Sequence, residues 1–166
     1  MSTALTYQRM RRLYPLKPLV KRSPVDLGRH RLRKPQFDGR PGWILLTQDS
    51  EGIAQALFVD KSEKPESVSI ILDERVFSDT VMRVVRLSKD VFVVYDLKTL
   101  NGISVFETQN YERRQETLRG ILEMFHHPDL VALILPEDAP AGTVLRGYEH
   151  YDDQPGTLGA FLPAEE

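Results

Sequence analysis

The 166-residue sequence contains no cysteine, which excludes disulfide bonds and thiolate metal sites and leaves the redox compartment open. It also lacks any apolar run near the roughly 18 residues that a membrane-spanning helix needs. The basic N-terminus is not followed by an apolar segment, so we expect neither a signal peptide nor a membrane anchor. We therefore expect an intracellular protein, in a compartment that the sequence does not indicate.

Positive charge is missing from the end of the chain and concentrated at its start. Residues 148–166 contain no Lys or Arg, whereas residues 1–40 hold 11 of the 22 and only two acids, a net charge of +9. The whole chain carries −2, so the remaining 126 residues sum to −11. Such a split indicates an anionic partner for the basic end. The alternatives are an arm that docks on the acidic body of the same chain or on a neighbouring subunit.

The changes in charge along the sequence divide the chain into a basic arm (1–33), a folded domain (34–147) and an acidic tail (148–166). Within the arm, residues 3–13 fit a short helix, and prolines from Pro15 onward stop a longer one, so residues 14–33 should be extended. We expect the tail segment 149–153 to be solvated rather than to bind a metal. The arm residues predicted to bind nucleic acid are Arg9, Arg11, Arg12, Lys17, Lys21, Arg22, Arg29, Arg31 and Arg33.

The body of the chain predicts an α+β fold with mainly antiparallel sheets and a packed helix. Segments 43–47, 54–59 and 67–72 are rich in β-branched and aliphatic residues and form a predicted meander. Segment 80–87 should pair with 91–95, which is apolar enough to be buried on both faces and should end at Asp96. A short strand over 130–135 follows later, then a turn over 137–140.

Between those strands, Asn101-Gly102 is a strong tight-turn dipeptide, and 103–106 should return from it as a strand. Asn110 can cap a helix over 111–126. The stripe Leu118, Ile121, Leu122 and Phe125 recurs at helical spacing and predicts the buried face. Arg113, Arg114, Arg119 and Glu123 should lie largely on the opposite face.

Three sequence elements appear in a characteristic order: Tyr95-Asp96 at a strand, Leu100-Asn101-Gly102, and Arg113-Arg114 in a helix. This order resembles the adenylation domain of ATP-dependent DNA ligases, one of the covalent nucleotidyltransferases together with RNA ligases and mRNA capping enzymes. The resemblance covers roughly residues 34–147 and implies a truncated nucleotidyltransferase-like domain. We expect this chain to end before the OB-fold domain that those enzymes use to close over the nucleotide.

In that family the nucleophile is the lysine of Lys-x-Asp-Gly, whose amine attacks the α-phosphate of the nucleotide. This sequence has Gln36-Phe37-Asp38-Gly39, and an amide nitrogen is not a useful nucleophile. Lys34 lies two residues earlier, about 6 to 7 Å away along a strand, and cannot simply substitute. Arg40 follows the glycine directly, one place earlier than in the usual ligase pattern.

Other family elements are also altered. Segment 71–77 has Asp73 but no Asp-Gly-Glu, and Ala141 replaces a glutamate that assists metal and nucleotide binding. Arg146 stands where the family has a lysine, and the final pair of lysines is absent. The resemblance implies nucleotide-binding positions at Lys34, Gln36, Asp38, Arg40, Tyr95 and Arg146.

We therefore expect a catalytically inactive, ligase-like module that binds nucleic acid or a nucleotide, within a larger assembly. No cofactor is expected, and Mg²⁺ only if catalysis survives. DNA or RNA is the expected partner, protein partners or an oligomer are possible, and a membrane is not expected. The alternatives are a divergent ligase or capping-type enzyme and a structural subunit anchored by its basic arm.

Overall fold

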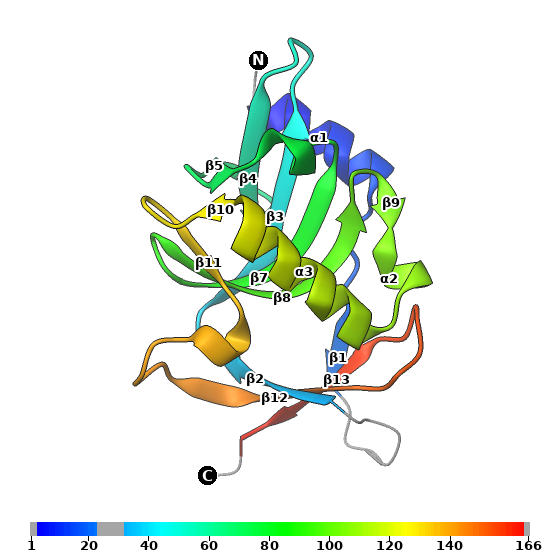
Figure 1. Ribbon diagram of the computed structural model, residues 1–166, viewed down its shortest axis with the longest axis vertical. Helices are drawn as coiled ribbons and strands as arrows, with labels where there is room; N and C mark the ends of the chain where they lie inside the picture. The colour runs from blue at the N-terminus through cyan, green and yellow to red at the C-terminus, as the bar shows by residue number, and fades with distance from the viewer. Residues whose placement is uncertain (1–2, 23–31, 165–166) are drawn as a thin grey trace.

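The computed structural model describes residues 3–22 and 32–164 (Figure 1). It confirms an α+β fold in which most strand pairs are antiparallel. Within the described residues, the larger sheet has seven strands in the order β11-β8-β7-β3-β4-β5, with β9 added on β8. Its strands are β3 (Arg40–Gln48), β4 (Ala54–Asp60), β5 (Glu66–Ser67), β7 (Thr80–Ser88), β8 (Val91–Leu100), β9 (Ile103–Ser104) and β11 (Ala132–Ile134).

A second sheet lies across the end of the first, in the order β1-β13-β12-β2. It comprises β1 (Val20–Arg22), β2 (Leu32–Phe37), β12 (Leu145–Tyr151) and β13 (Gly159–Pro163). Both predicted boundaries, after residues 33 and 147, fall inside strands of this sheet. The expected solvated tail is wrong for its side chains at Glu149 and Tyr151, which are 0% and 2% exposed because β12 turns them inward.

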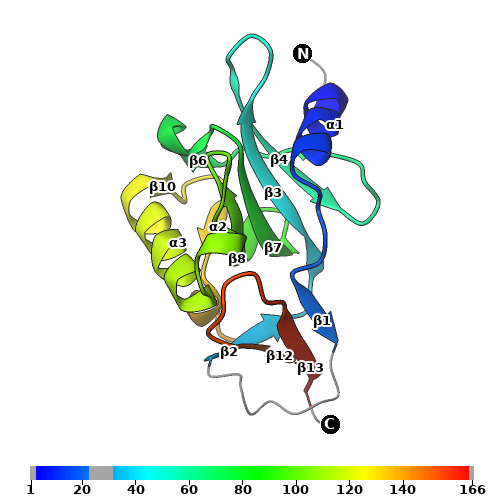
Figure 2. The ribbon, with the colours of Figure 1, turned by 90° about the vertical axis from the view of Figure 1, so that its right-hand side faces the viewer.

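The helices cover both faces of the larger sheet (Figure 2). They are α1 (Thr3–Leu13), α2 (Val105–Thr108), α3 (Tyr111–Phe125) and the 3₁₀ turns η1 (Glu74–Val76) and η2 (Pro136–Asp138). Helix α3 packs the predicted Leu118 and Ile121 into the main core, whereas Leu122 and Phe125 are only partly buried. On the other face, α1 buries Tyr7 and Met10 against Leu45, Leu57 and neighbouring apolar side chains.

The sequence predicted the central elements correctly. Segments 43–47, 54–59 and 80–87 lie within β3, β4 and β7, and segment 130–135 contains the shorter β11. As predicted, β7 pairs with β8. Asn101 and Gly102 form the tight turn, with φ values of 49° and 82° that an Asn-Gly pair tolerates well. The Asn110 side chain caps α3 by accepting a hydrogen bond from the Arg113 amide at 2.9 Å.

Three boundaries were wrong. Segment 67–72 is not one strand, because β5 ends at Ser67 and β6 (Ile71–Leu72) pairs instead with β10 (His126–His127). Strand β8 does not end at Asp96 but continues to Leu100, since β7 accompanies it along that length. The predicted strand 103–106 ends at Ser104, where the short helix α2 begins and buries Val105 and Phe106.

Candidate ligand cleft and the polar network beneath it

A cleft of about 500 Å³ lies where the N-terminal segment, the larger sheet and the smaller sheet meet. Tyr7 of α1 and several residues between Leu16 and Arg22 form one wall. Trp43 of β3 and Phe161 of β13 supply aromatic surface, and both rings are partly exposed. A cleft of this size and mixed lining is suited to a small ligand or to part of a longer one.

The mouth of the cleft carries unbalanced positive charge. Lys21, Arg22, Lys61 and Arg146 are exposed, line the cleft and have no ion-pair partner among the described residues. The two acids of the lining are already paired, Asp60 with Arg40 at 2.5 Å and Glu63 with Arg11 at 3.1 Å. Hydrogen bonds from the Ser62 side chain and Arg40 lower the pKa of Asp60 to about 2, so its charge persists at neutral pH and stays paired.

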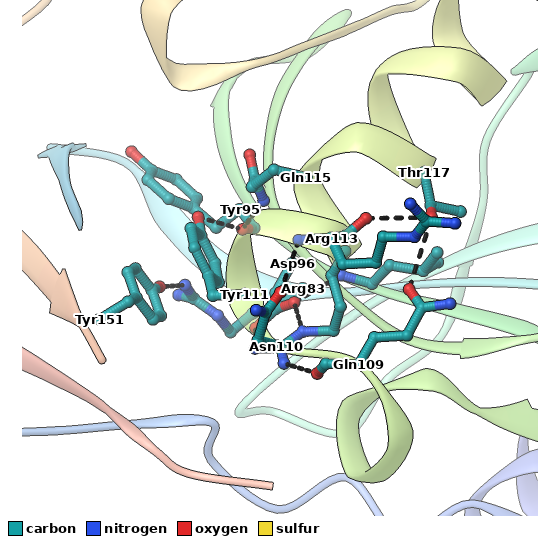
Figure 3. A network of polar contacts seen from close by, with 12 residues as sticks. Arg83, Tyr95, Asp96, Gln109, Asn110, Tyr111, Arg113, Gln115, Thr117 and Tyr151 are labelled. Atoms are coloured by element: carbon teal, nitrogen blue, oxygen red, sulfur yellow. Dashed lines mark hydrogen bonds and ion pairs between the residues drawn. The ribbon is translucent and has the colours of Figure 1, made fainter. Parts of the chain in front are cut away.

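Deeper in the cleft, Arg83 of β7 meets Glu149 of β12. The guanidinium donates from Nη1 to Glu149 Oε2 at 3.0 Å and from Nη2 to Glu149 Oε1. Nη2 also donates to the Tyr151 hydroxyl at 2.8 Å (Figure 3). That hydroxyl in turn donates to Glu149. Because Glu149 is fully buried and Arg83 only 12% exposed at its side chain, this ion pair joins the two sheets in a poorly solvated setting.

Gln36, the residue at the family's nucleophile position, belongs to the same network. Its Nε2 donates to Glu149 Oε2 at 2.6 Å. Glu149 thus accepts from Gln36, Arg83 and Tyr151 at once, and both carboxylate oxygens are satisfied. Gln36 therefore holds β2 to β12 and β7 in this structure.

Tyr95 lies beneath this network and is fully buried. Its hydroxyl accepts from the Phe37 amide at 3.0 Å and donates to the Pro35 carbonyl at 2.9 Å, which fastens β2 to β8. Burial raises the pKa of Tyr95, so the phenol stays neutral and can make both bonds. A nucleotide could not stack on this ring, and the predicted contact at Tyr95 is wrong because the whole side chain is enclosed by the fold.

Two further tyrosines complete the interior. Tyr111 and Tyr151 stack with ring centroids 3.5 Å apart and planes 5° from parallel. Tyr111 and Gln115 of α3 both donate to the Tyr95 backbone carbonyl at 2.8 Å (Figure 3). A chain of contacts therefore runs from α3 through Tyr95 of β8 to β2, and these contacts help to fix the relative positions of the two sheets.

Two of the motif elements that carry the family resemblance meet in an ion pair. Arg114 donates to Asp96 through Nε at 2.7 Å and through Nη2 at 3.0 Å, and Nη1 donates to the Gln109 carbonyl at 2.7 Å. The expected exposure of Arg114 was wrong, because it is 1% exposed at the side chain beside a fully buried Asp96. Burial raises the pKa of Asp96, and the Arg114 guanidinium opposes that rise.

The Asp38-Gly39 element has a structural explanation. A Cβ on Gly39 would lie 2.6 Å from the Arg86 carbonyl oxygen and 2.8 Å from Val85 Cγ1. The turn between β2 and β3 therefore touches β7 too closely for any side chain, and only glycine fits.

The predicted nucleotide-binding residues separate into two groups. Gln36 and Arg146 line the cleft together, and the Arg146 guanidinium lies 5.6 Å from the centre of the Phe161 ring. Lys34, Asp38 and Arg40 do not line it. Lys34 pairs with Glu137 at 3.1 Å, the Asp38 amide bonds the Val144 carbonyl, and Arg40 pairs with Asp60.

The predicted nucleic-acid-binding residues of the arm also have different surroundings. Arg9 pairs with Asp79 at 3.0 Å and Arg11 with Glu63, so the described part of the arm docks on the body of its own chain. Lys21 and Arg22 reach the cleft because β1 pairs in parallel with β13. Arg33 lies over the Tyr148 ring at 4.1 Å, and Arg12 and Lys17 are exposed. Arg29 and Arg31 lie outside the described residues.

Asp73 is used locally, as the cap of η1, where it accepts from the Arg75 amide and guanidinium. It does not line the cleft. Among residues 3–22 and 32–164 no group of three His, Asp or Glu side chains is arranged to hold a metal ion. In the same part of the chain no helix is long and apolar enough to cross a membrane.

Five functional candidates were missed by the sequence analysis: Trp43, Lys61, Arg83, Glu149 and Phe161. A usable clue existed for Arg83, since an arginine inside the apolar run Thr80–Leu87 needs a buried partner. Glu149 and Tyr151 share one face of a strand at i, i+2 spacing, which also marks an inward polar pair. Nothing local in the sequence indicated that Lys61 would line the cleft.

Comparison with known proteins does not assign this chain to a family. No protein-family model matches the chain, and no curated protein matches it.

Proposed function

We propose that this chain is a non-catalytic module that binds a nucleotide or a nucleic-acid strand in the cleft between its two sheets. The observation that carries this proposal is the charge of the cleft. Four exposed cations at its mouth have no acidic partner among the described residues, while both acids of the lining are neutralised by other arginines. Phosphate groups are the common biological anions that such a spread of lysine and arginine favours.

The aromatic lining supports the same ligand class. Trp43 and Phe161 expose part of their rings toward the cleft beside the cations Lys21, Arg22 and Arg146. Stacking of a base on such a ring is worth about 1–3 kcal/mol and tolerates any sequence, because every base has a π-face. Phosphate contacts and stacking together favour a ligand with both a phosphate and a base.

The surroundings of Gln36 support loss of covalent catalysis. Its amide is tied to Glu149, and a lysine at this position would face the same buried carboxylate. An amine beside a carboxylate favours its protonated form, which is not a nucleophile. Ala141 supplies no carboxylate for a metal, so a divergent enzyme is the weaker alternative.

The nucleotidyltransferase-like fold is part of the proposal. It is supported by the Asp96–Arg114 pair, which joins two of the motif elements, and by the close approach at Gly39, which explains a third. Asp96 and Arg114 are buried, and Gly39 is required by the close approach of the backbone. These motif residues match the family pattern. The altered positions are those that would act on a nucleotide, as expected of a domain that kept its fold and lost its reaction.

The test is equilibrium binding at low salt of dye-labelled single-stranded RNA, single-stranded DNA and ATP. Arg146→Ala should weaken binding several-fold, since Arg146 lies in the cleft. Arg113→Ala is the matched control, because it removes the same charge from an exposed face of α3 that is remote from the cleft lining. Equal effects of the two substitutions, or no binding by the wild-type protein to any probe, would refute the proposal.

A further inference from the structure

The orientation of the Gln36 side-chain amide is chemically determined. Glu149 is held by Arg83 as an ionised carboxylate, which can only accept hydrogen bonds. The Gln36 atom that lies 2.6 Å from it must therefore be the NH₂ group and not the carbonyl oxygen. Gln36 Oε1 is then an obligatory acceptor, and the second hydrogen of the NH₂ group is left over from the bond to Glu149.

That acceptor meets solvent in the cleft. Gln36 lines the cleft and is partly exposed. Among the described residues its Oε1 has no hydrogen-bond donor, and it is not one of the buried polar atoms that lack a partner. The cleft thus presents a neutral acceptor at its inner end.

Charge in the cleft is graded from inside to outside. The inner cation, Arg83, is neutralised by Glu149, whereas Lys21, Arg22, Lys61 and Arg146 at the mouth are exposed. A phosphate oxygen placed against Gln36 Oε1 would set two acceptors against each other. A hydroxyl or amino group in the same place would donate a hydrogen bond.

We propose that the ligand enters with its phosphates at the mouth and its hydroxyl- or amino-bearing part, the sugar or base, against Gln36. This inference rests on the proposed function and deepens it. Gln36 then determines specificity by accepting a hydrogen bond from a hydroxyl or amino group of the ligand. The orientation is the reverse of what a nucleophile at position 36 would require, since that chemistry places the phosphate there.

The experiment measures the affinity for dye-labelled single-stranded RNA and its salt dependence for wild type, Gln36→Leu and Gln36→Lys. Removal of one acceptor should weaken binding by Gln36→Leu about two- to tenfold without changing the slope of log affinity against log salt. Gln36→Lys should bind no tighter than wild type, again at the same slope. Arg146→Ala should instead flatten the slope by about 0.7. A melt of each variant establishes that it is folded.

A tighter Gln36→Lys complex with a slope steeper by about 0.7 would place a phosphate at position 36 and overturn the inference. Unchanged affinity of Gln36→Leu would overturn it as well. The broader proposal fails by a different result, namely no binding by the wild-type protein at low salt. The same titration with ATP distinguishes a free nucleotide from a polynucleotide as the source of the phosphate, sugar and base.

Discussion

The buried pair Asp96–Arg114 allows a sharp test of the fold, because its neighbour Arg113 provides an internal control. Arg114→Ala leaves Asp96 buried without its counter-ion, and among residues 3–22 and 32–164 only the Leu97 amide, at 2.9 Å, still donates to it. Removing one partner of a buried pair costs about 3–5 kcal/mol, since the remaining charge is uncompensated. The total stability of a domain is about 5–15 kcal/mol, so this single change should remove a large part of it.

Arg113 lies one residue earlier on the same helix and pairs with Glu116 at 3.6 Å, with both side chains more than 60% exposed. Arg113→Ala should therefore change the free energy of unfolding by no more than about 0.5 kcal/mol. Urea denaturation followed by circular dichroism measures both variants. The double variant Asp96→Ala with Arg114→Ala should be destabilised by less than the sum of the two single effects, because neither charge is then left alone.

A destabilisation below about 1 kcal/mol for Arg114→Ala, or similar effects for the two arginine variants, would refute this reasoning. Either result would mean that the pair is solvated in solution. The link between two motif elements would then have no energetic basis.

Three other predictions follow from particular contacts. Gln36→Lys should gain no nucleoside monophosphate in intact-mass measurements after incubation with ATP or GTP and Mg²⁺, because Glu149 would keep the amine protonated; a stable adduct would contradict this. Leu118→Ala should cost about 2–5 kcal/mol of unfolding free energy in a denaturant melt. The cost should exceed that of Phe125→Ala, because Leu118 is fully buried and Phe125 is only partly buried. The reverse order would mean that the helix face is wrong. Asp79→Asn should lower stability near pH 6, and urea midpoints across pH should show the difference shrinking as pH falls below the unfolded pKa of about 3.9. Burial raises the pKa of Asp79, but hydrogen bonds from Thr47, Tyr14 and Arg9 outweigh burial and lower it. The ionised carboxylate therefore adds stability above the unfolded pKa, and this stability is lost as pH falls through the folded pKa. A difference that persists in acid would contradict it.

The elements with strong local signals were predictable. Periodicity placed Leu118 and Ile121 in the core, and turn and cap chemistry identified Asn101-Gly102 and Asn110. Each of these depends on a few neighbouring residues. The split of 67–72 was not predictable in this way, because Ile71 and Leu72 pair with His126 and His127, more than fifty residues away.

The candidate site was only partly predictable for the same reason. The family resemblance singled out Gln36 and Arg146, and both line the cleft. The residues that give the cleft its chemistry come from distant strands, Arg83 on β7 and Glu149 on β12, and they meet only because the two sheets pack together. Arg114 was misplaced because its charge suggested exposure, whereas the buried Asp96 compensates it.

The central claim, that the cleft binds phosphate groups through its unpaired cations, is tested most directly by one salt titration. The measurement is the slope of log affinity against log salt for single-stranded RNA, for wild type and for the double variant Arg22→Ala with Arg146→Ala. If both arginines bind phosphates, the double variant should flatten the slope by about 1.4, which is about 0.7 for each phosphate that is no longer neutralised. An unchanged slope in the double variant, or a wild-type protein that does not bind at low salt, would contradict the claim.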